Sequence, residues 1–521
     1  MSKRKIKKKN KKEFNALQKN LTDPQFLKVT LLLIFIILGA LVLRMKGFDQ
    51  FHLFTFDEKL YTKMGYQLKD DFLNYSTKDT YNLMLQNDEK PPDYLKKPLF
   101  KHPPLYCQLI SLSHRLHGLN QTFQDEYFAQ EETLQYVIDF GYVSAVGVSM
   151  VFGLLTLVIV FFIGKIVHNS CVGLIAAFLI AIDPVHWICS QKIWMETTVT
   201  FFMTISILLF LIALDNETFF KYVGLAFGLA LLTKYPAVLI GVSIFVYASF
   251  IRRDLLTKKN FWEVYLVAFI VTTPWIIWNI QVYGWSLLVS EFAIIKDVKK
   301  AVLTIRKLAL TGLFIGAVFG IYFSFKHKII HFYENNIKKI SSKIAFHFRK
   351  KKLIILVIFF VSILVIIFKN PLRSYLIQLF SLQHVPRNGW EIELFRNEPW
   401  YFYIKRLTVL SPLYLLAYGG LLLYGFRDKK IVFIAINTII IMLFFIKWRN
   451  FQCRYILPAV PLLHVMCATF IYKLHNILIT IKYRNKKVFL RSVFCLILLL
   501  FLVKTIQIDF HLAFPNNTCY F

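Results

Sequence analysis

The chain has 521 residues, of which 57% are hydrophobic, 17% aromatic and only 18% charged. A soluble domain carries roughly 45–50% apolar and about 25% charged residues, whereas the apolar excess here falls in charge-free runs of about 17–25 residues, the length that crosses roughly 30 Å of hydrocarbon. This pattern excludes a water-soluble core and predicts an all-α polytopic membrane protein.

Thirteen apolar runs are predicted to span the membrane. The first ends at Leu43 and is followed by Arg44 rather than by small residues, so we interpret it as an uncleaved helix and not as a signal peptide. The run at 222–233 is the shortest, and Lys234 and Pro236 follow it directly. The spans are expected at residues 26–43, 140–164, 171–188, 197–214, 222–233, 236–251, 261–280, 302–323, 353–368, 407–424, 431–446, 455–471 and 488–503.

The net charge of +32 is concentrated in a leader and in short loops on one side of the predicted spans. Short basic loops stay in the cytoplasm, so the N-terminus is expected to be cytoplasmic. Topology and attraction to anionic lipid explain the charge, and no nucleic-acid partner is expected. The basic segments are residues 1–25, 252–259, 326–352, 427–430 and 473–487.

The loop at 44–139, which follows the first span, has the opposite charge balance. It holds fourteen of the thirty acidic residues against eleven Lys or Arg. The alternation of spans puts this loop outside the cytoplasm. A long, folded, acidic exterior loop is therefore expected to carry function.

An acidic pair, Asp57 and Glu58, lies near the start of this loop, just outside the membrane, and Tyr61 follows one helical turn later. A carboxylate here can accept a proton as a general base. The alternative is that either residue is a solvated loop charge or a helix cap.

A basic pair, Lys101 and His102, precedes two prolines about 45 residues later. Residues before proline avoid helix, so an extended elbow is expected, with a helix starting at Leu105 and carrying Tyr106. Leucines repeat along one face of that helix, which is typical of an amphipathic helix at a membrane interface. They are Leu105, Leu109, Leu112 and Leu116.

Two acidic residues stand near later span ends. Glu196 opens a span, and an ionisable residue there is a functional candidate because hydrocarbon disfavours its charge. Glu196 is a candidate ligand for a divalent ion together with Asp57 or Glu58, since hard cations prefer carboxylate oxygens. Asp183 precedes Pro184, where it can serve as a turn cap. The seven cysteines form no CxxC pair, so neither a zinc site nor a disulfide framework is indicated.

These motifs, in this order, resemble the GT-C class of membrane glycosyltransferases. The resemblance is to the branch of the lipid A aminoarabinose transferases and the bacterial relatives of dolichyl-phosphate-mannose-protein mannosyltransferases. Lys101 stands where eukaryote-type protein O-mannosyltransferases carry an acid, so the acceptor is not assigned by this kinship. The motifs are the acidic pair, the Lys-His-Pro-Pro elbow, Asp183–Pro184, Trp194 to Thr197, Gly228 to Lys234, Thr273 to Trp275, and the Arg-Tyr-Ile-Leu-Pro run from Arg454.

The resemblance implies a GT-C-like bundle that moves a sugar from an undecaprenyl or dolichyl phosphate to a lipid, glycan or protein outside the cytoplasm, with inversion. Asp57 or Glu58 would be the base, and fixed cations would stabilise the leaving phosphate. Arg454 has the alternative role of an interface anchor, and a divalent metal is left open. The implied substrate-binding residues are Tyr61, Lys101, His102, Tyr106, Arg454 and Tyr455.

The predicted organisation is a basic cytoplasmic leader (1–25), a transmembrane catalytic module (26–470) and a segment (471–521) with a cytoplasmic loop, the last span and a short exterior tail. The membrane would be the bacterial plasma membrane, or the endoplasmic reticulum in a eukaryote. Alternatives are a transporter or lipid flippase, which leaves the acidic loop unexplained, and a non-catalytic GT-C relative.

Overall fold

The computed structural model describes eleven segments of the chain, which fall in two compact units, one of residues 1–272 with 382–521 and one of residues 273–381. Within the second unit only 273–283, the end of one helix, are described, so the helix packing and the site belong to the first unit. The described segments are residues 24–45, 55–73, 75–77, 82, 84–86, 102–118, 140–283, 401–426, 428–448, 452–480 and 484–513.

Every regular element in these segments is a helix, and some are short 3-10 turns (η). The elements are α2 (Pro24–Met45), α3 (Phe56–Asp70), α5 (Leu105–Leu116), α7 (Phe140–Val167), α8 (Ser170–Ala181), α9 (Pro184–Ser190), α10 (Met195–Ala213), η2 (Glu217–Phe219), α11 (Phe220–Thr233), η3 (Tyr235–Ala237), α12 (Val238–Phe250), η4 (Arg253–Thr257), α13 (Lys259–Tyr283), α19 (Phe402–Leu410), α20 (Leu413–Tyr424), α21 (Lys429–Trp448), η5 (Cys453–Ala459), α22 (Val460–Ile479) and α23 (Arg484–Ala513).

The all-α polytopic membrane architecture is confirmed. Among the described residues, seven helices are long and apolar enough to cross a membrane, or eight if the bent pair α8 and α9 is one span. Eleven of the thirteen predicted spans fall on described helices, while those at 302–323 and 353–368 lie outside the described residues. The total of thirteen therefore stays a prediction.

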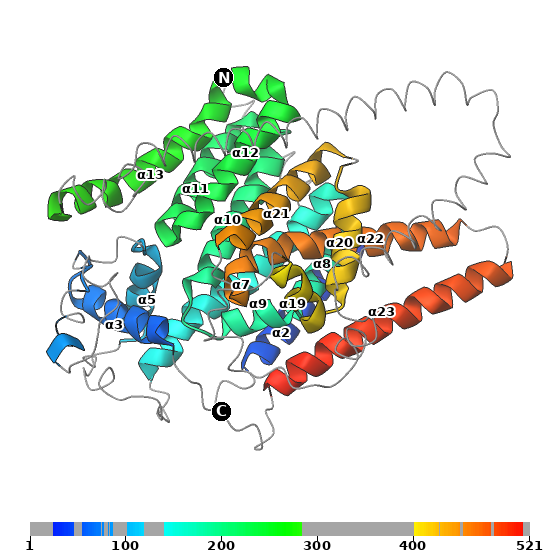
Figure 1. Ribbon diagram of the computed structural model, residues 1–521, viewed down its shortest axis with the longest axis horizontal. Helices are drawn as coiled ribbons and strands as arrows, with labels where there is room; N and C mark the ends of the chain where they lie inside the picture. Colours follow the sequence, from blue (N-terminus) through cyan, green and yellow to red (C-terminus); the bar gives the residue numbers. More distant parts are fainter. Residues whose placement is uncertain are drawn as a thin grey trace, which may run out of the picture. The chain divides into compact units, whose positions relative to one another are not determined.

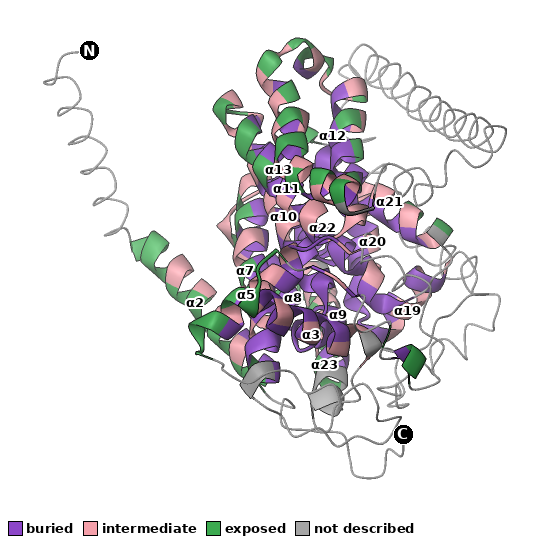
Figure 2. Cartoon of the chain, turned by 90° about the vertical axis from the view of Figure 1, so that its left-hand side faces the viewer, coloured by how far each residue is buried: buried purple, intermediate pink, exposed green. Residues whose placement is uncertain are grey.

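The bundle is built around α10, which packs against α7 and α11, while α22 packs against α8 and α20 (Figure 1). In its most apolar stretch α10 is 78% buried and α2 only 6%, so α10 is a core helix and α2 presents its apolar surface to lipid. Gly420 lets α20 approach α22 closely, because a Cβ there would collide with the backbone carbonyl of Met466. Such small residues are typical of helix contacts inside membranes. Figure 2 shows the buried residues gathered where these central helices meet.

Two breaks in the membrane helices bring polar residues to the bundle. Between α8 and α9 the chain bends by 63°, where Asp183 has an extended backbone and caps α9 by accepting the backbone N–H of His186. The turn cap expected at Asp183 is thus confirmed. The second break is at Lys234, which is extended between α11 and η3 and precedes Pro236 by two residues. Proline cannot continue a helix from the preceding turn.

In the loop that follows the first span, α3 and α5 pack against each other. The guanidinium of Arg115 on α5 donates to the carbonyls of Leu68 (3.1 Å) and Lys69 (3.0 Å) in the last turn of α3, where carbonyls have no N–H donor within the helix. The helix start expected at Leu105 is confirmed. The exposure of Leu112 and Leu116 agrees with an apolar face turned outward.

Candidate functional site

The acidic pair opens α3, where Glu58 is part of the helix cap. The Glu58 carboxylate reaches back and accepts the backbone N–H of Thr55 (2.9 Å) and its hydroxyl (3.1 Å). This is one half of a capping box, and the positive end of the helix dipole favours carboxylates in the first turn. For Glu58, the structure therefore agrees with the helix cap, one of the alternatives considered for this pair from the sequence.

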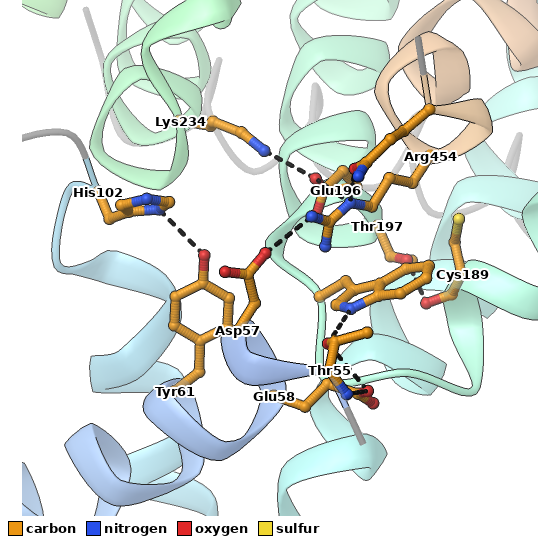
Figure 3. Close-up of polar contacts among 12 residues, drawn as sticks. Thr55, Asp57, Glu58, Tyr61, His102, Cys189, Glu196, Thr197, Lys234 and Arg454 are labelled. Carbon is orange, nitrogen blue, oxygen red and sulfur yellow. Dashed lines mark hydrogen bonds and ion pairs between the residues drawn. The ribbon is translucent and has the colours of Figure 1, made fainter. Parts of the chain in front are cut away.

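The second oxygen of Glu58 binds the segment between α9 and α10. It accepts the backbone N–H of Ile193 at 3.2 Å, and the Lys192 ammonium lies 3.7 Å from the carboxylate, with both side chains almost fully buried. The indole N–H of Trp194 donates to the Thr55 hydroxyl at 3.1 Å. These contacts hold the start of α3 against the membrane bundle. Figure 3 shows the Asp57 side chain directed away from Glu58 and towards Arg454.

Asp57 belongs to a row of four alternating charges drawn from four parts of the chain (Figure 3). Its carboxylate accepts a hydrogen bond of 2.8 Å from Nη2 of Arg454, on η5. The Arg454 Nε lies 3.6 Å from Oε1 of Glu196 at the start of α10. The same oxygen accepts a hydrogen bond of 2.7 Å from the ammonium of Lys234. Arg454 is thus shared by two carboxylates, and Glu196 by two cations.

Aromatic rings and an amide hold the two cations in place. The Arg454 guanidinium lies 4.7 Å from the ring centre of Trp194 and 5.3 Å from that of Tyr455. The Lys234 ammonium lies 5.0 Å from the ring centre of the same Tyr455. Gln452 accepts a hydrogen bond of 2.7 Å from Nε of Arg454. Cation–π contacts of this kind are stronger where water is excluded.

His102, Tyr61 and Tyr106 form a neighbouring wall. The Tyr61 hydroxyl shares a hydrogen bond of 3.0 Å with Nδ1 of His102, and the Tyr106 ring packs edge-on against Tyr61. Burial lowers the pKa of His102 from 6.5 to about 4, despite the opposing charge of Asp57. The expectation that His102 is a fixed cation is therefore corrected: near neutral pH it is an uncharged hydrogen-bonding group.

Asp57 stays ionised although it lies in a confined site. Burial by itself raises the pKa of Asp57. The positive charge of Arg454 and its hydrogen bond lower that pKa by more, so it lies below its ordinary value. The Asp57 side chain is 23% exposed and that of Lys234 is 19% exposed, against 9% for Arg454 and 4% for Glu196. A bound molecule would therefore meet Asp57 and Lys234 first.

The divalent metal considered from the sequence stays a prediction for this site. The described residues form no group of three or more His, Cys, Asp or Glu side chains placed to hold an ion. The guanidinium of Arg454 contacts both Asp57 and Glu196 and supplies the positive charge that an ion would bring. No step below passes through a metal.

The structure brings together most of the residues singled out from the sequence: Asp57, Tyr61, His102, Glu196, Arg454 and Tyr455. Glu58 lies on the other side of α3, and Tyr106 supports Tyr61 while its hydroxyl bonds Ser149 at 2.9 Å. Lys101 lies outside the described residues.

Sequence reasoning missed Lys234, Lys192, Trp194 and Gln452 as parts of the site. Lys234 was noted as a charge that ends a short span and, like Trp194, as part of a motif of the resemblance, but neither was given a role in the site. The position of Lys234 directly before a break in the helix was the available signal, since a charge beside hydrocarbon needs a partner. Nothing in the sequence pointed to Lys192 or Gln452.

The helical bundle, with the helices α3 and α5 of its first loop packed at a charged site, is a membrane fold of the GT-C class. The family model described as "Dolichyl-phosphate-mannose-protein mannosyltransferase" matches residues 132–278, which include Glu196 and Lys234. No curated protein matches the chain by sequence.

A solved archaeal membrane enzyme shares this fold at low sequence identity. The oligosaccharyltransferase AglB of Archaeoglobus fulgidus, in complex with an inhibitory peptide and a dolichol-phosphate, is 16% identical with a TM-score of 0.52. The same enzyme tethered to an acceptor peptide is 14% identical with a TM-score of 0.53. Each match covers 94% of this chain and 56% of the archaeal chain, so this chain spans about half the length of that enzyme. ArnT of Cupriavidus metallidurans is 13% identical with a TM-score of 0.46, covering 92% of this chain and 76% of that one.

Proposed function

We propose that this protein is an inverting membrane glycosyltransferase that moves a sugar from a polyprenyl phosphate to an acceptor on the non-cytoplasmic face. The observation that carries the proposal is the ion pair of Asp57 with Arg454, beside Lys234 and Glu196, where the first exterior loop meets the bundle. It combines a partly exposed carboxylate with two cations at the edge of membrane helices.

In the proposed reaction an acceptor hydroxyl attacks the anomeric carbon of the bound sugar. A bond forms between the acceptor oxygen and that carbon, and the bond from the carbon to the phosphate oxygen breaks. The phosphate keeps the electron pair, and the hydroxyl proton passes to Asp57, which its low pKa keeps in the anionic form. Attack from the face opposite the leaving phosphate inverts the anomeric centre.

The leaving phosphate gains negative charge, which fixed cations stabilise. Lys234 and Arg454 are the cations that contact Glu196 in the described site, and the planar fork of Arg454 suits a phosphate through two parallel hydrogen bonds. Neutral His102 adds a ring N–H as a donor, and Lys101 is proposed as a third cation. Tyr61 and Tyr455 would contact the sugar or the phosphate.

The dolichol-phosphate bound by the archaeal enzyme and the mannosyltransferase family model both support a lipid-linked donor. The sugar would be a hexose or pentose and the acceptor a lipid, glycan or protein. The protein would lie in a bacterial plasma membrane, or in the endoplasmic reticulum of a eukaryote, with its N-terminus in the cytoplasm.

A deletion strain tests the proposal and names the donor. Loss of the protein should leave an unused polyprenyl-phosphate sugar, detected by mass spectrometry of extracted lipids. The purified protein in proteoliposomes should then convert that lipid to free polyprenyl phosphate when acceptor is added, and the Asp57→Asn variant should not. Movement of the intact lipid between leaflets without cleavage of the sugar–phosphate bond would establish a flippase instead.

A further inference from the structure

Asp183, at the bend between α8 and α9, is a fully buried carboxylate that joins three helices. One oxygen accepts the backbone N–H of His186 at 2.9 Å. The other accepts the Tyr414 hydroxyl of α20 at 2.6 Å and Nε2 of His464 of α22 at 2.9 Å. All these side chains are buried, and a buried carboxylate is tolerated only where donors and nearby charge replace water.

Arg44, at the end of α2, brings a positive charge to this cluster. Its guanidinium donates to Nδ1 of His186 at 2.8 Å and to the carbonyl of Ala181 at 3.2 Å. Asp183, His186, Tyr414, His464 and Arg44 are here called the Asp183 cluster. The proposed reaction makes no use of it.

The first connection from the cluster to the site runs along α9. Asp183 caps the first turn of this seven-residue helix. Near its other end, the carbonyl of Cys189 accepts the Thr197 hydroxyl at 2.8 Å, and Thr197 is the neighbour of Glu196 (Figure 3). A rotation of α9 would therefore displace the start of α10 and with it Glu196.

The second connection runs through α22. His464 lies in the second turn of α22, and the turn directly before this helix, η5, carries Arg454. The two helices that carry other cluster residues pack against these elements: α9, with His186, contacts η5, and α20, with Tyr414, contacts α22. A shift of α22 away from Asp183 would therefore move Arg454.

The two connections meet again in the site, where the Arg454 Nε lies 3.6 Å from Glu196 Oε1. We propose that Asp183 is a positioning residue that fixes the distance between Arg454 and Glu196, and so the shape of the donor-phosphate site, without touching substrate. This rests on the proposed function.

Asp183→Asn tests the proposal by steady-state kinetics on the purified protein. Asparagine keeps one carbonyl oxygen for the His186 N–H but loses the oxygen that accepts from Tyr414 and His464. The KM for the polyprenyl-phosphate sugar should rise about tenfold, within the range that small displacements of positioning groups produce, while the KM for the acceptor stays within about twofold. Unchanged KM values with kcat lowered only in proportion to folded protein would overturn the proposal.

His464→Gln and the double variant show whether the pair acts as a unit. Each single change should produce the same rise in donor KM, and the double variant no larger one, because residues in one network are not additive. The matched control is Asn169→Ala. Asn169 caps α8 by accepting the backbone N–H of Val172 at 3.0 Å, so its loss removes a comparable cap at the end of α8 opposite Asp183, and donor KM should stay unchanged. An equal defect in this control would reduce Asp183 to a general stabiliser.

Hydrogen exchange separates this inference from the proposed function. Asp183→Asn should speed amide exchange in both 192–197 and 452–459, and Asn169→Ala in neither, whether or not transfer is observed. If the unmodified protein transfers no sugar but both segments respond, the proposed function fails and the mechanical link stands. If the protein transfers sugar and the two segments do not respond, the positioning role fails.

Discussion

At the scale of single residues, two adjacent carboxylates, Asp57 and Glu58, differ in their surroundings and therefore in the role each can have. Glu58 is fully buried and occupied by the Thr55 cap, the Ile193 amide and the Lys192 ammonium. Asp57 is partly exposed and faces Arg454. Of the two, Asp57 is therefore the one we propose as the group that receives the proton of a bound acceptor.

Asp57→Asn should therefore lower kcat by about 10²-fold or more, the usual contribution of a positioned general base. Transfer from the purified donor measures it. Glu58→Gln is the matched control: it removes the carboxylate charge beside Lys192, so it should lower the thermal midpoint in detergent while the folded fraction keeps its activity within a few-fold. Full activity in Asp57→Asn would remove Asp57 from the mechanism.

His102 should make the fold sensitive to acid. Its pKa is about 4 in the folded protein against 6.5 when unperturbed, so between these values the unfolded chain binds the extra proton. Stability from this group is present above pH 6.5 and is lost as pH falls through the window towards 4. His102→Asn should flatten the dependence of the thermal midpoint on pH between 4 and 6.5. An unchanged slope would show that His102 is exposed to water in the folded protein.

The contact of Arg454 with both Asp57 and Glu196 leads to a prediction about metals. Dialysis against a chelator should leave transfer unchanged, and Mn²⁺ titrated into the protein should show no tight binding by electron paramagnetic resonance. Arg454→Gln removes the positive charge between the carboxylates and should increase Mn²⁺ binding. Loss of activity on chelation, restored by Mg²⁺ or Mn²⁺, would mean that an ion reaches the site with further ligands.

At the scale of elements, short irregular pieces place the reactive groups. η5 is a 3-10 turn with Pro458 inside it, and it projects Arg454 towards two carboxylates instead of along a regular helix face. The break at Lys234 does the same between α11 and η3. Regular membrane helices form the frame, and their interruptions carry the charges.

Arg454→Lys tests whether η5 presents a fork or only a charge. Lysine keeps the charge but has one nitrogen, whereas arginine contacts Asp57 through Nη2 and both Glu196 and Gln452 through Nε. Donor KM should therefore rise nearly as much in Arg454→Lys as in Arg454→Ala, with transfer from purified donor as the assay. Full activity with normal donor affinity in Arg454→Lys would return Arg454 to the role of an interface anchor, which lysine fulfils equally well.

At the scale of the whole molecule, the charge pattern predicts the side on which the site opens. The acidic loop 44–139 should be exterior and the basic segment 252–259 cytoplasmic. Leu73→Cys on the loop and Thr257→Cys in η4 are both exposed positions. In intact cells an impermeant thiol reagent should label the first and not the second, above the background of the unmodified protein. The reverse pattern would invert the topology and place the site in the cytoplasm.

The sequence by itself determined the membrane class and the acidic first loop, because hydrocarbon thickness and charge bias act on local composition, and eleven of its predicted spans fall on described helices. It also supplied Asp57, Glu196 and Arg454 as candidates through short motifs. Only the tertiary structure decided that Glu58 also binds the Ile193 amide, that His102 is neutral and that Lys234 pairs with Glu196. Each of these depends on contacts between segments far apart in the chain, up to the 397 residues that separate Asp57 from Arg454. Burial and charge pairing at such a distance leave no local pattern in the sequence.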